Sequence, residues 1–289
     1  MVLTVEQTRI PVTGVHRRYT KRPLAVTDAL DFWSFAGAAA NVAMQMMNPG
    51  VGHGVVESKV DSGALMKRPW KRARTTTQYL AVAILGNEKE IDAFREAVNV
   101  AHRQVHSAPG AAVKYNAFDR NLQLWVAACL FIGFEDSYQL LHGRLSDEHA
   151  ESFYQSAAVL ATSLQVPRDM WPATRGDFDD YWVRACAETR LDEPVAAYVD
   201  DLLHLRMINL PMRLVFGSLL RFLTIGFLAP HFREQMGVNW TAAEQRRFEN
   251  LFVFVGFVNR FIPRFLRFGG SYSLMMDLRH RISAGKPII

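Results

Sequence analysis

Apolar residues recur at every third or fourth position along most of this sequence, and this spacing constrains the fold more than any other feature. Such a period is typical of amphipathic α-helices, whereas the alternation typical of β-strands is nearly absent. Apolar residues make up 49% of the 289 residues, so the chain can bury a sizeable core without a disulfide or a metal. We therefore predict an all-α protein, with a single globular domain of about nine helices.

Capping and stop signals divide the periodic stretches into individual helices. Asn87 followed by Glu90 is a capping box. The run from Asn48 to Gly54 indicates a turn and a glycine-rich loop, and the tail around Gly269 and Gly270 indicates irregular structure. We expect an irregular N-terminal arm over residues 1–25 and the helical domain over residues 26–289. The predicted helices cover residues 26–47, 72–85, a segment that starts at 87, and residues 119–142, 146–165, 178–190, 193–204, 208–227 and 241–262.

Charge and cysteine usage limit the location and the partners. The formal net charge of +5 favours a mild attraction to anionic surfaces, and we expect no nucleic-acid partner. Residues 1–26 contain no apolar segment of the kind that signal peptides carry. Residues 208–230, the most apolar region, are interrupted by proline and arginine, so we expect no membrane span. Cys129 and Cys186 lie within predicted helices, as in cytosolic proteins. We predict a cytoplasmic protein and leave contact with a membrane surface open.

His102 is the first candidate for chemistry. Counted from Phe94 and Val98, it lies on the apolar face of its predicted helix. A neutral imidazole there can bind iron or zinc if its other nitrogen finds a partner, but a core histidine bonded to a carbonyl has the same spacing. His106 follows one helical turn later. Arg103 stands where an H-E-x-x-H site has its glutamate, so a zinc hydrolase is not expected.

Arg72 and Thr76 are a second candidate, since residues four apart share one helix face. A guanidinium and a hydroxyl on one face can hold an anionic group or an oxygen species bound to iron. The same residues also suit a solvated helix start whose threonines bond back to the helix.

The C-terminal run from Arg260 to Phe268 interleaves arginine with bulky apolar residues. Such a segment can lie on an anionic membrane surface or stack on nucleic acid. In most globular proteins the phenylalanines of such a run enter the core and the arginines form a wet rim.

A set of segments follows a recognisable order along the chain: residues 45–51, the pair Arg72 and Thr76 leading into Tyr79-Leu80, and residues 100–105, 115–119, 124–126, 164–167 and 171–172. In this order they resemble the catalytic domain shared by latex-clearing proteins (rubber oxygenases) and MpaB-type ER-bound oxygenases. The resemblance extends from about Phe32 to about Phe268. Thr75 stands where rubber-cleaving members can carry a lysine, so the resemblance favours oxygenase activity more strongly than it favours rubber as the substrate.

The resemblance implies an α-helical fold around a non-covalent b-type haem. His102 would be the axial ligand of the haem iron, and Arg72 and Thr76 would belong to the haem pocket. The implied function is a haem-dependent oxygenase that uses dioxygen on a hydrophobic, isoprenoid-like substrate. The alternative is a haem- or lipid-binding helical protein without turnover that associates peripherally with membranes.

Overall fold

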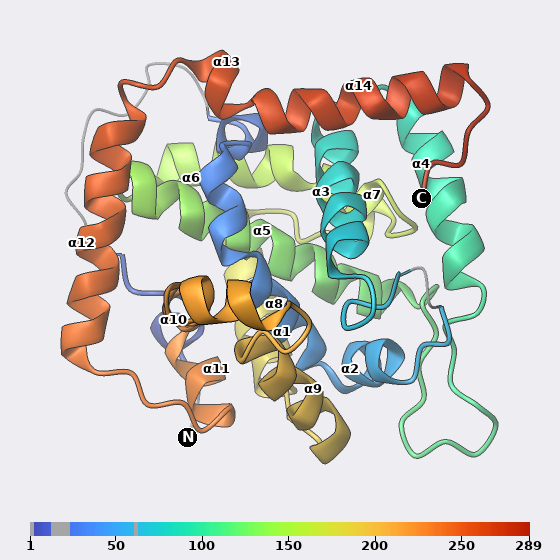
Figure 1. Ribbon diagram of the computed structural model, residues 1–289, viewed down its shortest axis with the longest axis horizontal. Helices are drawn as coiled ribbons and strands as arrows, with labels where there is room; N and C mark the ends of the chain where they lie inside the picture. Colours follow the sequence, from blue (N-terminus) through green and yellow to red (C-terminus); the bar gives the residue numbers. More distant parts are fainter. Residues whose placement is uncertain (1–2, 13–23, 61–62) are drawn as a thin grey trace.

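The protein is all-α and forms a single domain, as predicted. A computed structural model describes residues 3–12, 24–60 and 63–289 (Figure 1). Over these ranges the only strand-like pairing is an isolated bridge between His106 and Asn116. Short 3-10 helices precede the main body at Glu6–Thr8, Val26–Ala29 and Phe32–Gly37. The α-helices are α1 (Ala38–Met46), α2 (Pro49–Val56), α3 (Pro69–Leu85), α4 (Glu88–His102), α5 (Arg120–His142), α6 (Asp147–Ala157), α7 (Val159–Thr162), α8 (Arg175–Ala187), α9 (Glu193–Leu203), α10 (Leu210–Gly226), α11 (Pro230–Gln235), α12 (Ala242–Asn259), α13 (Arg264–Arg267) and α14 (Gly269–Ser283).

Helix α5 runs through the centre of the domain and contacts α1, α7 and α12 (Figure 1). Asp119 caps its first turn by accepting hydrogen bonds from two backbone amides. Most of its side chains are buried, and Trp125 stacks on Trp182 of α8 at 5.1 Å between ring centroids. Among the described residues α5 alone is long and apolar enough to cross a membrane, but 83% of that window is buried inside the protein, as in the core helix of a folded domain.

The glycine-rich loop predicted after Asn48 is wrong, because these residues form α2. Asn48 caps α2 by accepting from the amides of Gly50 and Val51, and Pro49 occupies the first turn. The glycines allow close packing: a methyl group on Gly52 would overlap the carbonyl oxygen of Met46 and lie 2.9 Å from a methyl carbon of Val195. Tight packing therefore outweighs the low helix propensity of glycine.

The irregular tail predicted from Gly269 is also wrong, because these residues begin α14. Helix α14 lies across α3 and also contacts α4 (Figure 1). Asp277 accepts from Arg74 at 2.7 Å and from Gln78 at 3.1 Å, and these contacts hold α14 on α3. Contacts with residues far away in the sequence therefore stabilise α14, although the local sequence does not predict a helix there.

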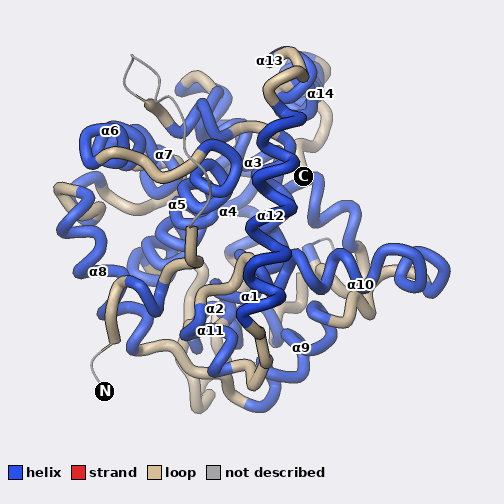
Figure 2. The backbone as a smooth tube through the Cα atoms, turned by 90° about the vertical axis from the view of Figure 1, so that its left-hand side faces the viewer, coloured by secondary structure: helices blue, strands red, loops and turns tan. Residues whose placement is uncertain are grey.

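Other boundaries differ by less. The helix predicted over residues 26–47 divides into two 3-10 helices and α1, the one over 146–165 breaks between α6 and α7, and the last long helix ends at Asn259. Residues 13–23 of the predicted N-terminal arm lie outside the described residues. Ile10 and Val12 of the same arm are buried in the core. Helix α10 projects from the body of the domain (Figure 2).

Candidate functional site

Helix α3 carries Arg72 and Thr76 one turn apart, as the sequence predicts. Thr75 and Thr77 donate back to helix carbonyls at 2.9 and 2.5 Å. Thr76 makes no such bond, so among the three consecutive threonines its hydroxyl alone is left for an external partner. The side chain of Thr76 is half-buried.

Arg72 has no ion pair or hydrogen bond with any residue that the structure describes. Its surface is exposed, yet burial lowers the pKa of its guanidinium, and Tyr198 of α9 only partly offsets that effect. A methyl group on Gly63 would lie 3.7 Å from Nη1 of Arg72, which places the segment before α3 against the same side chain.

His102 is the last residue of α4 and is half-buried. Its Nδ1 is buried without a hydrogen-bond partner in the described structure, and its more accessible Nε2 has none either. Burial, with the nearby charge of Arg72 as a second cause, lowers the pKa of His102 to about 4. The imidazole is therefore neutral at pH 7, the state in which it can bind a metal. The prediction that a carbonyl satisfies this ring is not met among the described residues.

The prediction that His106 lies one helical turn after His102 is wrong. Helix α4 ends at His102, and the chain turns into a loop whose His106 is exposed and bridges to Asn116. A zinc pair at helical spacing therefore does not form. No group of three or more histidine, cysteine and acidic side chains able to hold a metal ion occurs in residues 3–12, 24–60 and 63–289.

The loop after α4 is held firmly, and this restrains the helix end that carries His102. The amide of Ser107 donates to the Tyr115 carbonyl at 2.9 Å, and the phenol of Tyr115 donates to Glu57 at 2.9 Å. Phe118 lies edge-on to the His102 ring, with 6.3 Å between centroids. These contacts fix the position of the imidazole without occupying its nitrogens.

Two sets of contacts near the site were not predicted from the sequence, one at Arg72 and one at His53. Tyr198 of α9 lies close enough to Arg72 to influence its pKa, and no local signal in the sequence links it to α3. Glu57 accepts from His53 Nδ1 at 2.8 Å, and Asp192 lies 3.2 Å from Nε2 of the same ring. These partners raise the pKa of His53, Glu57 more strongly than Asp192, and join α2 to the start of α9.

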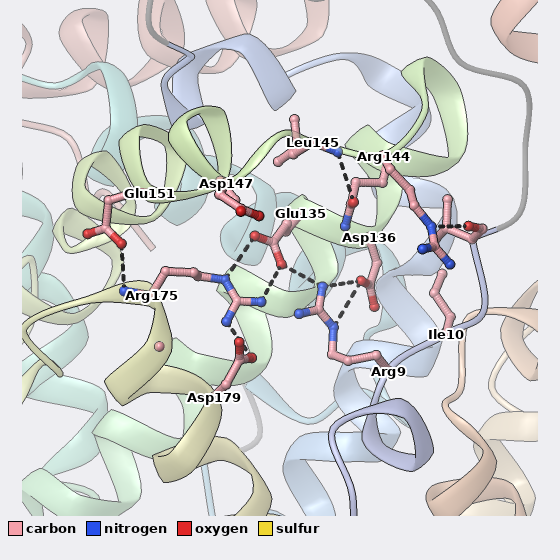
Figure 3. Close-up of a pocket in the computed structure, with 14 residues that line it drawn as sticks. Arg9, Ile10, Glu135, Asp136, Arg144, Leu145, Asp147, Glu151, Arg175 and Asp179 are labelled. Atoms are coloured by element: carbon pink, nitrogen blue, oxygen red, sulfur yellow. Dashed lines mark hydrogen bonds and ion pairs between the residues drawn. The ribbon is translucent and has the colours of Figure 1, made fainter.

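A separate polar pocket of about 520 Å³ lies between the N-terminal segment, α5 and α8 (Figure 3). Arg9 Nη2 lies 2.5 Å from both Glu135 and Asp136, while Arg175 lies 3.0 Å from Glu135 and pairs with Asp179. Burial opposes the charge of Glu135, but the two arginines keep its pKa below the ordinary value. Both arginines are paired with carboxylates of the core, so this cluster is a structural link between the N-terminal segment and the core.

The cysteines play a packing role. Cys129 and Cys186 are both buried and free, and burial raises the pKa of each thiol. A buried protonated thiol behaves as a small apolar side chain.

The fold and the site together define an all-α protein with a neutral, unpartnered imidazole close to an unpaired guanidinium. Over residues 28–257 the chain matches the family described as the catalytic domain of ER-bound oxygenase mpaB/B' and rubber oxygenase. The chain belongs to this family, and the resemblance noted in the sequence is confirmed.

Similar proteins occur in mycobacteria. The chain is 46% identical over 251 residues to the proteins named "Uncharacterized protein Rv2237" of Mycobacterium tuberculosis and "Uncharacterized protein Mb2261" of Mycobacterium bovis. Each alignment covers 87% of this chain and 98% of the relative. No solved structure matches.

Proposed function

We propose that this protein is a haem b-dependent oxygenase that uses dioxygen, with His102 as the axial ligand of the haem iron. The observation that carries the proposal is a half-buried, neutral imidazole whose buried Nδ1 has no partner, next to an exposed guanidinium without a partner. Membership of an oxygenase catalytic-domain family supports the reaction class.

The donor chemistry of these residues fits a haem group. A neutral imidazole binds haem iron, and a guanidinium pairs with the carboxylates that a haem carries. Bound haem supplies the one-electron and dioxygen chemistry, while the protein supplies binding, orientation and electrostatics.

Each side chain then has a distinct task. His102 holds the group through its accessible Nε2, and its neutral state needs no proton to be displaced at pH 7. Arg72 binds an anion, either a carboxylate of the cofactor or the reacting oxygen, and the free hydroxyl of Thr76 donates a hydrogen bond on the same helix face. A preorganised donor of this kind contributes ~3–4 kcal/mol to transition-state stabilisation in known sites.

The substrate and the location are the remaining parts of the proposal. A hydrophobic, isoprenoid-like substrate is supported by the rubber oxygenase in the family description. A cytoplasmic location is supported by two free, buried cysteines.

The test is a titration of the purified protein with haemin, followed by absorption spectra of the oxidised and reduced forms. Wild type should develop a Soret band, and His102→Ala should lose haem affinity or show a changed spectrum. His106→Ala is the matched control, because that exposed histidine lies four residues further on and should leave the spectrum unchanged. Absence of a Soret band in wild type, or an unchanged spectrum in His102→Ala, overturns the proposal.

Oxygen consumption separates the oxygenase from a haem-binding protein without turnover. The reduced, haem-loaded protein should take up dioxygen in the presence of an isoprenoid alkene, and Arg72→Gln should slow this uptake. A protein that binds haem through His102 but consumes no oxygen with any alkene supports the alternative function.

A further inference from the structure

The turn between α12 and α14 exposes two of its three phenylalanines, and two of its arginines pair with carboxylates. Phe261 is 73% exposed and Phe265 68%, whereas Phe268 alone among the phenylalanines from 261 onward is buried. The expectation of core phenylalanines with an arginine rim is therefore wrong for most of this run. We call the exposed set the corner patch: Phe254, Phe257, Phe261, Phe265 and Leu266.

Ion pairs hold the corner patch in this orientation. Arg267 lies 2.9 Å from Asp31, which is 2% exposed and also accepts from Asn259 at 2.7 Å. Arg264 lies 3.4 Å from Asp28. Because the arginines pair with carboxylates of the N-terminal 3-10 helices, α13 is fixed with its apolar side outward.

Helix α10 presents a second exposed apolar surface. Its first half projects from the domain (Figure 2), and Leu214 and Val215 are 75% and 71% exposed. We call this set the α10 patch: Leu210, Leu214, Val215, Phe216, Leu219 and Leu220. Large exposed apolar sets on a folded domain mark surfaces that contact a partner or a membrane.

The segments that carry the two patches contain arginines but no acidic residues. Residues 207–233 and 250–276 contain no Asp or Glu, and each stretch contains three arginines. Residues 204–289 together carry twelve Arg and Lys against four acidic residues, whereas residues 1–203 carry 21 against 24. The exposed Arg221 and Arg260 form no ion pair with residues of the described chain, although Glu244 of α12 lies near enough to Arg221 for the arginine to lower its pKa.

This charge distribution favours one occupant. Two copies of the chain that met through these patches would bring like charges together, which is unfavourable. An anionic lipid surface offers apolar depth for the side chains and phosphates for the free arginines.

We propose that the corner patch and the α10 patch dock this protein on the surface of an anionic lipid bilayer. The aromatic and aliphatic side chains enter the interface between headgroups and acyl chains, and Arg221 and Arg260 bind phosphates at its surface. The contact is peripheral, and it does not depend on haem or on the oxygenase reaction.

The experiment is flotation of the full-length protein with vesicles of phosphatidylcholine alone or with one third phosphatidylglycerol. We expect wild type to float with the anionic vesicles and to be released as salt rises, since screening weakens attraction to the headgroups. Phe261→Ser with Phe265→Ser should weaken binding about tenfold or more, and Leu214→Ser with Val215→Ser should do the same. Arg260→Glu should reduce the preference for anionic vesicles. Val5→Ser, which alters an exposed apolar residue elsewhere, is the matched control and should bind as wild type does.

Three results overturn the proposal. The first is equal binding of wild type to neutral and anionic vesicles, and the second is no binding to either at low salt. The third is a wild-type dimer in sedimentation that both double variants convert to a monomer, since the patches would then join two copies. Circular dichroism of each variant shows whether it is folded, so that misfolding is not mistaken for lost binding.

Discussion

Acid should destabilise this protein in part through His102, because the folded protein resists protonation of this ring. Burial, with the charge of Arg72 as the second cause, lowers the pKa of His102 to about 4 in the folded state, against about 6.5 in an unfolded chain. Between these values the unfolded chain binds a proton that the folded protein does not bind, so folding stability falls as the pH falls. The stability is complete above pH 6.5. At pH 5 the two pKa values correspond to a loss of about 2 kcal/mol.

Urea unfolding of wild type and His102→Gln at pH 8 and pH 5 measures this loss. The free energy of unfolding of wild type should fall by about 2 kcal/mol more than that of His102→Gln, because glutamine does not titrate. His106→Gln retains His102 and should therefore retain the larger loss. An equal loss in wild type and His102→Gln would refute the reasoning, since His102 would then have an ordinary pKa in the folded protein.

Two substitutions outside the site test the packing. Glu135→Gln removes the carboxylate shared by two buried arginines and should cost about 3–5 kcal/mol, which lowers the Tm on the order of 10 °C, whereas Glu96→Gln, from an exposed ion pair, should cost less than about 1 kcal/mol. Similar Tm values for the two variants would contradict the structural role of the buried network. Gly52→Ala should destabilise by about 1–3 kcal/mol, because its methyl overlaps a backbone oxygen that cannot move away, whereas Gly217→Ala in α10 meets only ordinary contacts and should be neutral or stabilising. A more stable Gly52→Ala variant, measured by thermal unfolding, would show that α2 packs less tightly than described.

The local sequence predicts the helices whose ends carry their own signals. The capping box of Asn87 and Glu90 is present in the structure, and the helix predicted from residue 119 begins at Arg120, with Asp119 as its cap. Helix α2 was not predicted, because three glycines in eight residues argue against a helix unless a neighbour requires their lack of side chains. The neighbours are the end of α1 and Val195, which lies 143 positions along the chain from Gly52. A contact between residues so far apart cannot be predicted from periodicity in the sequence.

The candidate site, too, was predicted only in part from the sequence. Helical spacing places Arg72 with Thr76 and places His102 on the inner side of α4, but spacing alone does not distinguish a ligand from a core histidine. A ligand is distinguished from a core histidine by whether its ring nitrogens have hydrogen-bond partners, and only the tertiary structure shows this. The same holds for the ion pairs of a guanidinium group. Tyr198 belongs to α9 and approaches α3 only through the tertiary fold, so no local pattern links it to Arg72.

Arg72 differs from three other arginines whose pKa values depend on burial, because each of those has an acceptor. Arg9 and Arg175 are buried against carboxylates that keep their pKa values raised. Burial lowers the pKa of Arg233 to about 10, but this guanidinium donates to the carbonyls of Ile225 and Gly226, both at 2.9 Å. Arg72 has no acceptor among the described residues, and the neutral His102 close to it supplies no negative charge. Its guanidinium donors are therefore free to bind an anionic group between α3 and the end of α4.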